Sequence, residues 1–330
     1  MAIKKSGLAR YRKQYEWSNI LAMLKNNRRD PKICEEGSQG KLIVITGATS
    51  GIGLVTAKKY AAQGANLICI NRNKEKSETL KQTIESTYNT SCQFLLADLS
   101  ILKDVHDVAN QLARHPEPID VMIHNAGVYL NKREVTVDGL EKVFMVHYLA
   151  PFIINCHLIE KMKSQESGRI ILVNSEGHRF AAWGIHTNDL NWEKRRYSGL
   201  GSYGSAKTAQ LQSMLIFNQL LDKTGVTINA MHPGAVKSAT GQENGPLYRW
   251  FKNNVLERHL KPATISSESL YYLGISSEIT EISGKFFNLT ELEDPAPPAM
   301  DIEIAEELWQ ISLEMGGVKD PRSESNSNKS

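Results

Sequence analysis

Tyr203 and Lys207, four residues apart, are the side chains of this sequence that best fit proton transfer. A tyrosine hydroxyl has a reference pKa of about 10 and is a poor acid or base near neutral pH. A neighbouring cation favours the phenolate and brings that pKa closer to the working range. Residues four apart share one face of a helix, so a helix that starts here would stack the pair. An isolated pair of this kind is mostly a surface contact, and its interpretation therefore depends on the surrounding sequence.

A glycine-rich turn follows the β-branched run from Lys41 to Thr46 and opens an amphipathic stretch. Gly47 permits a tight turn, Gly51 lets the backbone approach a pyrophosphate, and Gly53 allows a helix to pack closely on a strand. The helix N-terminus attracts phosphate charge. A plain tight turn is the alternative, but the place directly after a strand favours a dinucleotide site. Its predicted binding residues are Gly47, Ser50, Gly51, Ile52 and Gly53.

The end of the second expected strand bears on which dinucleotide binds. Enzymes that prefer NAD place a carboxylate there for the ribose hydroxyls, whereas a 2′-phosphate needs a cation. This sequence has Asn71, Arg72 and Asn73 at that point and no carboxylate. Arg72 is a candidate for a bidentate phosphate contact, with a solvated loop residue as the alternative. We therefore expect NADP as the cofactor, and NAD as the less favoured one.

Strand and helix patterns alternate through the middle of the chain. Short β-branched runs predict strands at 41–46, 66–70, 93–97, 121–124, 170–173, 226–230 and 285–288. Amphipathic stretches predict helices from the glycine turn to 63 and at 75–85, 101–113, 139–162, 205–221 and 266–275. Such alternation is typical of a parallel sheet covered on both faces. We expect the α/β class: a single doubly wound Rossmann domain with a mainly parallel sheet and helices on both faces.

Three zones divide the chain: a basic amphipathic extension at 1–40, the Rossmann domain at 41–315, and a tail at 316–330 that is predicted to be disordered. Between Met1 and Lys32, nine basic residues stand against two acidic ones. Within this stretch Trp17, Ile20 and Leu24 have helical spacing, as does Leu21. A basic amphipathic helix can lie on an anionic membrane. It can equally dock on its own domain or on the neighbouring subunit of a homodimer, and these alternatives stay open.

Composition narrows the classes of partner and compartment. The formal net charge of +3 is too small to argue for a nucleic-acid partner. The four cysteines have no CxxC spacing, so neither a metal site nor a disulfide framework is expected. They fit a reducing compartment and a cytoplasmic protein, with peripheral membrane association as the alternative. No apolar stretch approaches the roughly 20 residues that span a bilayer.

Six short motifs in one order make the chain resemble the short-chain dehydrogenase/reductase family, and more narrowly its retinol-dehydrogenase-like branch. Each is short, but six in order at the expected strand ends and helix starts are a specific signal. The resemblance covers about 41–315 and implies an NAD(P)-dependent enzyme that acts on CH–OH and C=O groups. The motifs are Thr46–Gly53, Asp98-Leu99, Asn125-Ala126-Gly127, Ser175, Tyr203-x-x-x-Lys207 and Pro233-Gly234.

By that resemblance, several residues hold the cofactor. Asp98 would bond the adenine amine, Asn125 would stabilise the central strands, and Gly127 would border the cofactor. The run from Pro233 to Val236 would pass beneath the nicotinamide, and Ser238 would hold its carboxamide. The implied cofactor-binding residues in this part are Asp98, Leu99, Asn125, Ala126, Gly127, Tyr203, Lys207, Pro233, Gly234, Val236 and Ser238.

The resemblance also implies the catalytic roles. Ser175, at a strand end, would hold and polarise the substrate oxygen, and Lys207 would bind the nicotinamide ribose as well as assist Tyr203. One position departs from the family pattern. His147 stands where the family usually has an asparagine that holds a proton-relay water. An imidazole can serve that relay and add a pH dependence, or be a core histidine with a structural partner. Both interpretations stay open.

The substrate is expected to be lipophilic. Gly245–Lys252 carries aromatic and aliphatic residues in a region that closes over the substrate in such enzymes, although ordinary packing is an equal alternative. A retinoid, steroid or lipid aldehyde would fit. The alternative function is an NADP-binding sensor or scaffold with little turnover. His147 is its one support, whereas the intact Ser175, Tyr203 and Lys207 favour an active enzyme.

Overall fold

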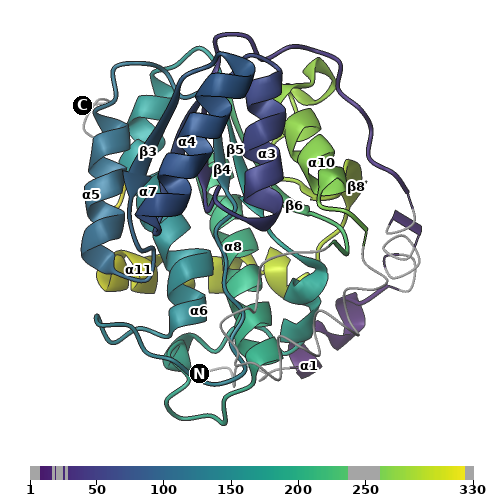
Figure 1. Cartoon of the computed structure of the whole chain (residues 1–330). Coiled ribbons are helices and arrows are strands. Elements are labelled where there is room, and N and C mark those ends of the chain that lie inside the picture. The colour runs from purple at the N-terminus through teal and green to yellow at the C-terminus, as the bar shows by residue number, and fades with distance from the viewer. Residues whose placement is uncertain (1–7, 17–18, 20–24, 27–28, 237–260, 324–330) are drawn as a thin grey trace, which may run out of the picture.

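The computed structural model describes residues 8–16, 19, 25–26, 29–236 and 261–323. Within them, one sheet has the strand order β3-β2-β1-β4-β5-β6-β7-β8 (Figure 1). The first seven strands run parallel, and β8 pairs antiparallel with β7. The strands are β1 (Leu42–Thr46), β2 (Asn66–Asn71), β3 (Cys92–Leu96), β4 (Val121–His124), β5 (Gly168–Val173), β6 (Val226–His232), β7 (Phe286–Asn288) and β8 (Glu291–Glu293).

Helices connect successive strands and cover the sheet. They are α1 (Leu8–Tyr11), α3 (Gly51–Ala62), α4 (Lys74–Tyr88), α5 (Leu102–Ala113), α6 (Lys142–Phe144), α7 (Ala150–Lys163), α8 (Gly199–Leu220), α10 (Thr264–Ile275) and α11 (Ile302–Gly316). A π-helical segment, η2 (Met145–Leu149), joins α6 to α7 without a break. The 3₁₀ segment η3 (Glu176–Ala181) follows β5.

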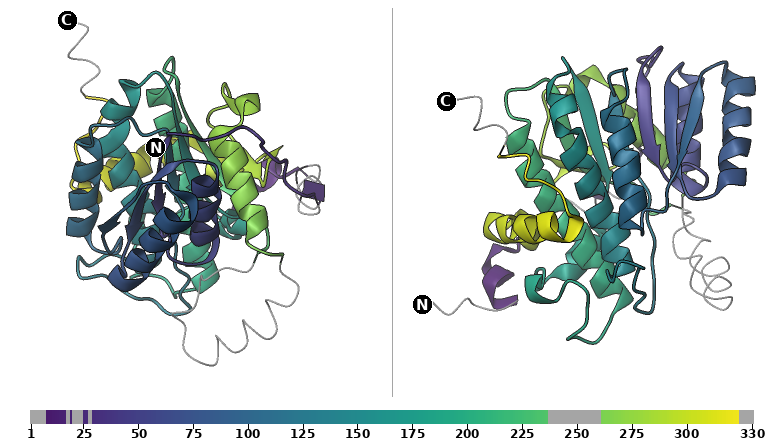
Figure 2. Two further views of the ribbon diagram at one scale, coloured as in Figure 1. Left: turned by 45° about the horizontal axis from the view of Figure 1, so that its top comes forward. Right: turned by 90° about the vertical axis from the view of Figure 1, so that its left-hand side faces the viewer.

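Two hydrophobic cores lie on the two faces of the sheet because successive side chains of a strand point to opposite faces. In β1, Leu42 and Val44 join the core that α5, α7 and α8 cover. Ile43 and Ile45 join the core that α3, α4 and α10 cover. Burial on both faces explains why β1 reads as a continuous apolar run. Figures 1 and 2 show the two helix layers, and the doubly wound α/β fold with a mainly parallel sheet is confirmed.

The seven expected strands are present within a few residues, while one short strand was not expected and one helix begins earlier than expected. Strand β8 was missed because Glu291–Glu293 is only three residues long and carries no β-branched residue. Helix α8 begins at Gly199 and not at Ser205. Ser198 caps it by accepting the N–H of Gly201 at 3.3 Å, so the small residues before Ser205 belong to the helix and not to a turn.

One continuous helical stretch in the described residues, Lys142–Lys163, passes a length-and-hydropathy test for a membrane span. Its apolar window is 78% buried inside the fold, as in the core helix of a globular protein. Phe152 illustrates the reason, since its ring packs 4.9 Å from that of Trp309 in α11. By length and composition, this stretch differs from the expectation that no apolar stretch approaches the length of a membrane span.

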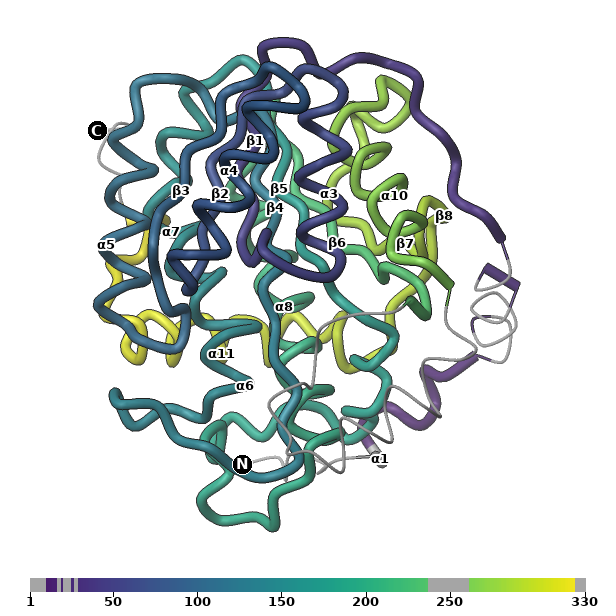
Figure 3. The backbone as a smooth tube through the Cα atoms, viewed as in Figure 1, coloured from purple at the N-terminus to yellow at the C-terminus, as the bar shows by residue number. Residues whose placement is uncertain are grey.

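The described part of the N-terminal extension lies on the C-terminal half of its own domain. Tyr11 is buried and donates to the Asp301 carboxylate at 2.8 Å, while Arg10 pairs with the same carboxylate at 2.7 Å. The N–H of Lys32 donates to the Thr290 hydroxyl at 3.0 Å. Figure 3 shows the segment passing α10 and β8. The predicted amphipathic residues Trp17, Ile20, Leu21 and Leu24 lie outside the described residues.

The beginning of the expected disordered tail is ordered. Arg322 pairs with Asp320 at 2.9 Å and with Glu306 of α11 at 2.7 Å, and its guanidinium lies over the Trp309 ring. These contacts tie residues up to 323 to α11, which the polar composition of the tail did not indicate. Residues 324–330 lie outside the described part.

Candidate active site

A cavity of about 550 Å³ opens at the carboxyl ends of β1, β2, β4, β5 and β6. This edge of a parallel sheet is where doubly wound folds bind ligands. Of the predicted site residues, Gly53 is not among the residues that line the pocket, and Ser238 lies outside the described residues. The others line the cavity together: Gly47, Ser50, Gly51, Ile52, Arg72, Asp98, Leu99, Asn125, Ala126, Gly127, His147, Ser175, Tyr203, Lys207, Pro233, Gly234 and Val236.

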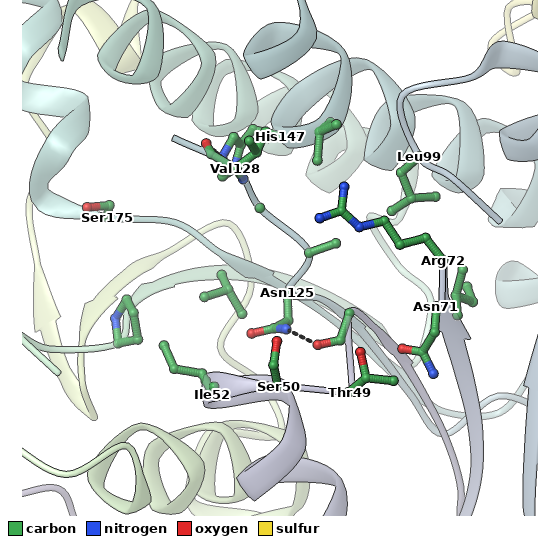
Figure 4. Close-up of a pocket in the computed structure, with 18 of the residues that line it drawn as sticks. Thr49, Ser50, Ile52, Asn71, Arg72, Leu99, Asn125, Val128, His147 and Ser175 are labelled. Atoms are coloured by element: carbon green, nitrogen blue, oxygen red, sulfur yellow. Dashed lines mark hydrogen bonds between the residues drawn. The ribbon is translucent and has the colours of Figure 1, made fainter. Parts of the chain in front are cut away.

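The glycine turn has the geometry that the sequence predicted. Gly47 and Gly51 have positive φ angles of 72° and 55°, which side chains other than glycine rarely adopt. A Cβ on Gly53 would lie 2.2 Å from the Gly47 carbonyl oxygen and 2.5 Å from Asn125 Nδ2. Asn125 Nδ2 donates to the Gly47 oxygen at 3.1 Å (Figure 4). Ser50 precedes α3 and makes no side-chain cap, which leaves the helix N-terminus suited to an anion.

The end of the cavity beside β2 and α4 is lined by the cations Arg72 and Lys76. Figure 4 shows Arg72 reaching from the end of β2 toward the centre of the pocket. Lys76, in the first turn of α4, also lines the pocket, and sequence reasoning missed it. Its position four residues after Arg72 at a helix start was the available signal. Among the described lining residues, Asp98 is the one carboxylate, and it accepts the N–H and hydroxyl of Ser100.

The structure brings Ser175, Tyr203 and Lys207 together at the other end. Burial raises the pKa of Tyr203, and a hydrogen bond from Ser175 lowers it in part. Lys207 Nζ lies 5.8 Å from the centre of the Tyr203 ring and donates to the Val173 carbonyl at 2.6 Å. Burial lowers the pKa of Lys207 to about 7. A phenol, a hydroxyl that contacts it and a buried amino group therefore meet at the pocket.

Buried amides hold the elements that carry these residues. Asn174 Nδ2 donates to the Lys207 carbonyl at 2.9 Å and to Gln210 Oε1 at 2.8 Å, and Asn174 Oδ1 accepts the Ser175 N–H at 2.8 Å. Gln210 Nε2 in turn donates to the His147 carbonyl at 3.1 Å. One network thus joins the end of β5, the helix α8 and the π-helical segment η2.

Glu141 is a buried residue near the site that sequence reasoning missed. Its carboxylate accepts the N–H groups of Val143 and Phe144 at the start of α6, at 3.2 and 2.8 Å. It also accepts the hydroxyls of Ser202 and Tyr197, both at 3.1 Å. Because Ser202 precedes Tyr203, this carboxylate ties the start of α6 to the start of α8. An acidic residue just before an apolar helix was the only sequence signal.

His147 packs against the strand-end segment and lines the pocket. Its Nε2 lies 2.7 Å from the Val128 carbonyl oxygen and 3.0 Å from the Val128 nitrogen. Its Cε1 would lie 2.4 Å from a Cβ on residue 127, so the imidazole occupies space that Gly127 leaves free. Burial, and then the charge of Lys207, lower the pKa of His147 well below its usual value. Both effects favour the neutral form of the ring.

The glycine turn yields the first testable prediction. Gly53→Ala forces the turn to shift, since backbone and Asn125 atoms occupy the new Cβ position. Overpacking of this kind costs about 1–3 kcal/mol. We expect lower thermal stability and NADPH binding weakened about tenfold, measured by fluorescence titration. Gly37→Ala, where no atom lies within 4 Å of the new Cβ, is the control and should match the wild type. Wild-type NADPH affinity in Gly53→Ala would contradict the assignment.

Comparisons with known proteins identify related dehydrogenases. A family model described as short chain dehydrogenase matches residues 41–185. Human retinol dehydrogenase 13 is 32% identical over 86% of this chain and 86% of its own length. Human retinol dehydrogenase 12 is 29% identical over 87% of this chain and 90% of its own length.

Among solved structures, a short chain dehydrogenase from Burkholderia cenocepacia in complex with NADP has a TM-score of 0.60 and 20% identity. It covers 77% of this chain and 97% of its own. At that identity, the likeness shows the fold alone. The match to human retinol dehydrogenase 13 covers most of both chains at 32% identity, and it therefore shows the family. This chain belongs to the short-chain dehydrogenase/reductase family, in its retinol-dehydrogenase-like branch, and is an NAD(P)-dependent oxidoreductase.

Proposed function

We propose that this protein is an NADP-dependent oxidoreductase for a lipophilic alcohol or carbonyl compound, with Ser175, Tyr203 and Lys207 as its catalytic centre. The observation that carries the proposal is the meeting of these three residues at one end of the dinucleotide-sized pocket. The retinol dehydrogenases among the relatives support a substrate of the retinoid, steroid or lipid aldehyde class.

The residues of the pocket fit a dinucleotide. The uncapped start of α3 and the glycine turn suit a pyrophosphate. Two buried polar atoms that line the cavity, Asn71 Nδ2 and His147 Nδ1, have no hydrogen-bond partner among the described residues. A ligand with several acceptors and donors would satisfy such atoms. When bound, the nicotinamide would supply or accept the hydride.

The chain's own residues then manage the substrate oxygen and its proton. Ser175 would hold the oxygen through its hydroxyl. Tyr203, with its pKa raised by burial, stays protonated at neutral pH and can deliver the proton to a reduced carbonyl. Lys207 in its charged form favours the phenolate left behind and would bind the ribose. His147 would serve a relay through Nδ1, while its Nε2 keeps the contact with Val128.

The charge at the adenosine end supports NADP. Arg72 and Lys76 approach the pocket from the end of β2 and the first turn of α4, where a 2′-phosphate would lie. Asp98, the one lining carboxylate in the described part, already accepts two bonds from Ser100. NAD specificity would call for a carboxylate that binds the ribose 2′-hydroxyl. At the end of β2, the described lining offers the cations Arg72 and Lys76 instead.

We further propose a cytoplasmic location, with contact at a membrane surface as the route to a lipophilic substrate. The contacts of Tyr11, Arg10 and Lys32 with the C-terminal half support docking of the N-terminal extension on its own domain. Membrane contact through Trp17 to Leu24 and a homodimer remain predictions from sequence.

Replacing the proton donor tests the catalytic centre. Tyr203→Phe removes the phenol hydroxyl and should lower kcat by about 10²–10⁴-fold. NADPH binding should stay close to wild type, because the ring and the rest of the pocket remain. Steady-state loss of NADPH absorbance on a panel of lipophilic aldehydes and ketones gives kcat. Tyr88→Phe, at the end of α4 and outside the pocket lining, is the matched control. Tight NADPH binding without turnover by the wild type on any substrate would favour the sensor or scaffold instead.

The preference for NADPH over NADH tests whether Arg72 binds the 2′-phosphate of the cofactor. Arg72→Asp replaces a cation with a carboxylate, and a lost charge-assisted hydrogen bond costs about 1.5–3 kcal/mol. We expect kcat/KM with NADPH to fall and the preference to shift toward NADH. Lys74→Asp makes the same change of charge on a side chain that is 70% exposed and absent from the pocket lining. Equal preferences in the Arg72 variant and the wild type would rule out the assignment.

From the burial of Lys207 we expect the rate of carbonyl reduction to depend on pH. Its pKa of about 7 means that Lys207 loses its charge as the pH rises through about 7. The phenolate that proton delivery creates then loses its cation, so kcat/KM for carbonyl reduction should be level below that pH and fall above it. Residual activity of Lys207→Arg should lack this decline, because a guanidinium stays charged. A fall confined to the region near pH 10, the ordinary tyrosine range, would show that Lys207 does not control the rate.

A further inference from the structure

His178 lies three residues after Ser175 and is fully buried. Ser175 caps the segment η3, since its hydroxyl oxygen accepts the Gly177 N–H at 3.0 Å. His178 Nδ1 lies 2.7 Å from the Ser175 carbonyl oxygen. On the other side of the ring, His178 Nε2 accepts the N–H of Ala296 at 3.0 Å. The imidazole thus spans the gap between the serine segment and the chain that follows β8.

These two partners fix the tautomer of the ring. A backbone N–H can only donate, so Nε2 is the bare acceptor and Nδ1 carries the hydrogen that Ser175 accepts. Burial, and then the charge of Arg179, lower the pKa of His178 to about 3. The same neutral tautomer therefore persists through the working pH range. A ring held by a donor on one side and an acceptor on the other cannot turn over without losing both bonds.

The chain around Ala296, which His178 contacts through Nε2, is itself held by further side chains. Glu293, three residues before Ala296, accepts Arg179 at 2.8 Å and Asn288 Nδ2 at 3.1 Å. Asn26 of the N-terminal extension donates to the same carboxylate at 3.1 Å. His178 is also tied to the catalytic helix, since the Thr208 hydroxyl donates to the His178 carbonyl at 3.1 Å. The imidazole therefore connects Ser175 to Ala296, in a segment that Glu293 and its partners hold in place.

We infer that His178 is a positioning residue for Ser175: it holds the serine backbone against Ala296 so that the hydroxyl stays in contact with Tyr203. This inference rests on the proposed function of Ser175 and deepens it. Groups at a catalytic centre must keep their geometry within about 0.5 Å. A displacement of about 1 Å can cost about 100-fold in rate. His178 is absent from the lining of the described pocket, so it would act through Ser175 and not on a ligand directly.

Two amide substitutions separate the two bonds of the ring. In His178→Asn, the amide NH₂ can take the place of Nδ1–H and keep the donor to Ser175. In His178→Gln, the longer amide can reach the Nε2 position and keep an acceptor for Ala296 while the donor to Ser175 is lost. His106→Gln is the matched control. His106 Nε2 also contacts a backbone carbonyl, that of Gly316 at 2.8 Å, but lies outside the pocket lining.

Three measurements read the result: kcat with NADPH and a lipophilic carbonyl, the Kd for NADPH, and hydrogen exchange at the Gly177 amide. The Gly177 amide donates to the Ser175 hydroxyl, so its protection reports the position of that hydroxyl without any turnover. We expect His178→Gln to lower kcat by about 100-fold and to speed exchange at Gly177, with the Kd for NADPH unchanged. His178→Asn should retain more activity and protection than the Gln variant, and His106→Gln should equal the wild type.

Unaltered kcat and Gly177 protection in His178→Gln would overturn the inference. So would equal losses in the Asn and Gln variants that follow a common fall in thermal stability and NADPH affinity, because these would indicate a purely structural histidine. If the wild type reduces no carbonyl on the panel, the proposed function fails. The exchange rate at Gly177 then decides by itself whether His178 holds Ser175.

Discussion

The pocket depends on the close approach of helix α3 to the end of β1. The Gly47 carbonyl, Gly53 and the Asn125 amide share a space in which a single added Cβ would collide with two of them. Asn125 bridges the turn by donating to the carbonyls of Thr46 and Gly47. This packing aims the N-terminus of α3 at the carboxyl edge of the sheet. The pyrophosphate site that we propose depends on that direction, since the first N–H groups of a helix carry partial positive charge.

The end of the pocket that holds Ser175, Tyr203 and Lys207 depends on a second constraint, the amide network of Asn174 and Gln210. Parallel strands end at one edge, but they do not by themselves set the distance from Ser175 to a helix that starts 24 residues later. Asn174 donates to the Lys207 carbonyl in α8, and Gln210 donates to the His147 carbonyl in the π-helical segment. Burial then changes the acid–base properties of Tyr203 and Lys207 in opposite directions. Both shifts have one cause, the cost of an unsolvated charge.

The serine side is braced from the opposite direction. His178 attaches the segment after Ser175 to Ala296, beyond β8. Arg179 and Asn26, the latter in the N-terminal extension, both bind Glu293 at the end of β8. Segments from both ends of the chain thus bear on the active site without lining it. This arrangement gives the N-terminal extension a role in the architecture of its own domain.

The sequence predicted some elements of the fold and site and missed others, for physical reasons that differ from element to element. Long β-branched runs such as Leu42–Thr46 identified the central strands because burial on both faces demands such residues. The short strand β8 escaped because its pairing with β7 comes from the tertiary fold and not from local composition. Lys76 and Glu141 escaped because a lysine near a helix start and a glutamate before a helix are ordinary surface residues until the fold places them.

By itself, the sequence determined the order of motifs, the doubly wound fold and the family. These depend on residue types whose local geometry is restrictive, such as glycine at positive φ and β-branched residues in buried strands. The tertiary structure alone decided what surrounds Tyr203 and Lys207, the neutral state of His147 and the bridge through His178. The physical reason is that pKa values and hydrogen-bond partners are set by burial and by neighbours distant in sequence. Only the fold brings Ala296 to His178, 118 residues away, or Lys207 to Val173, 34 residues away.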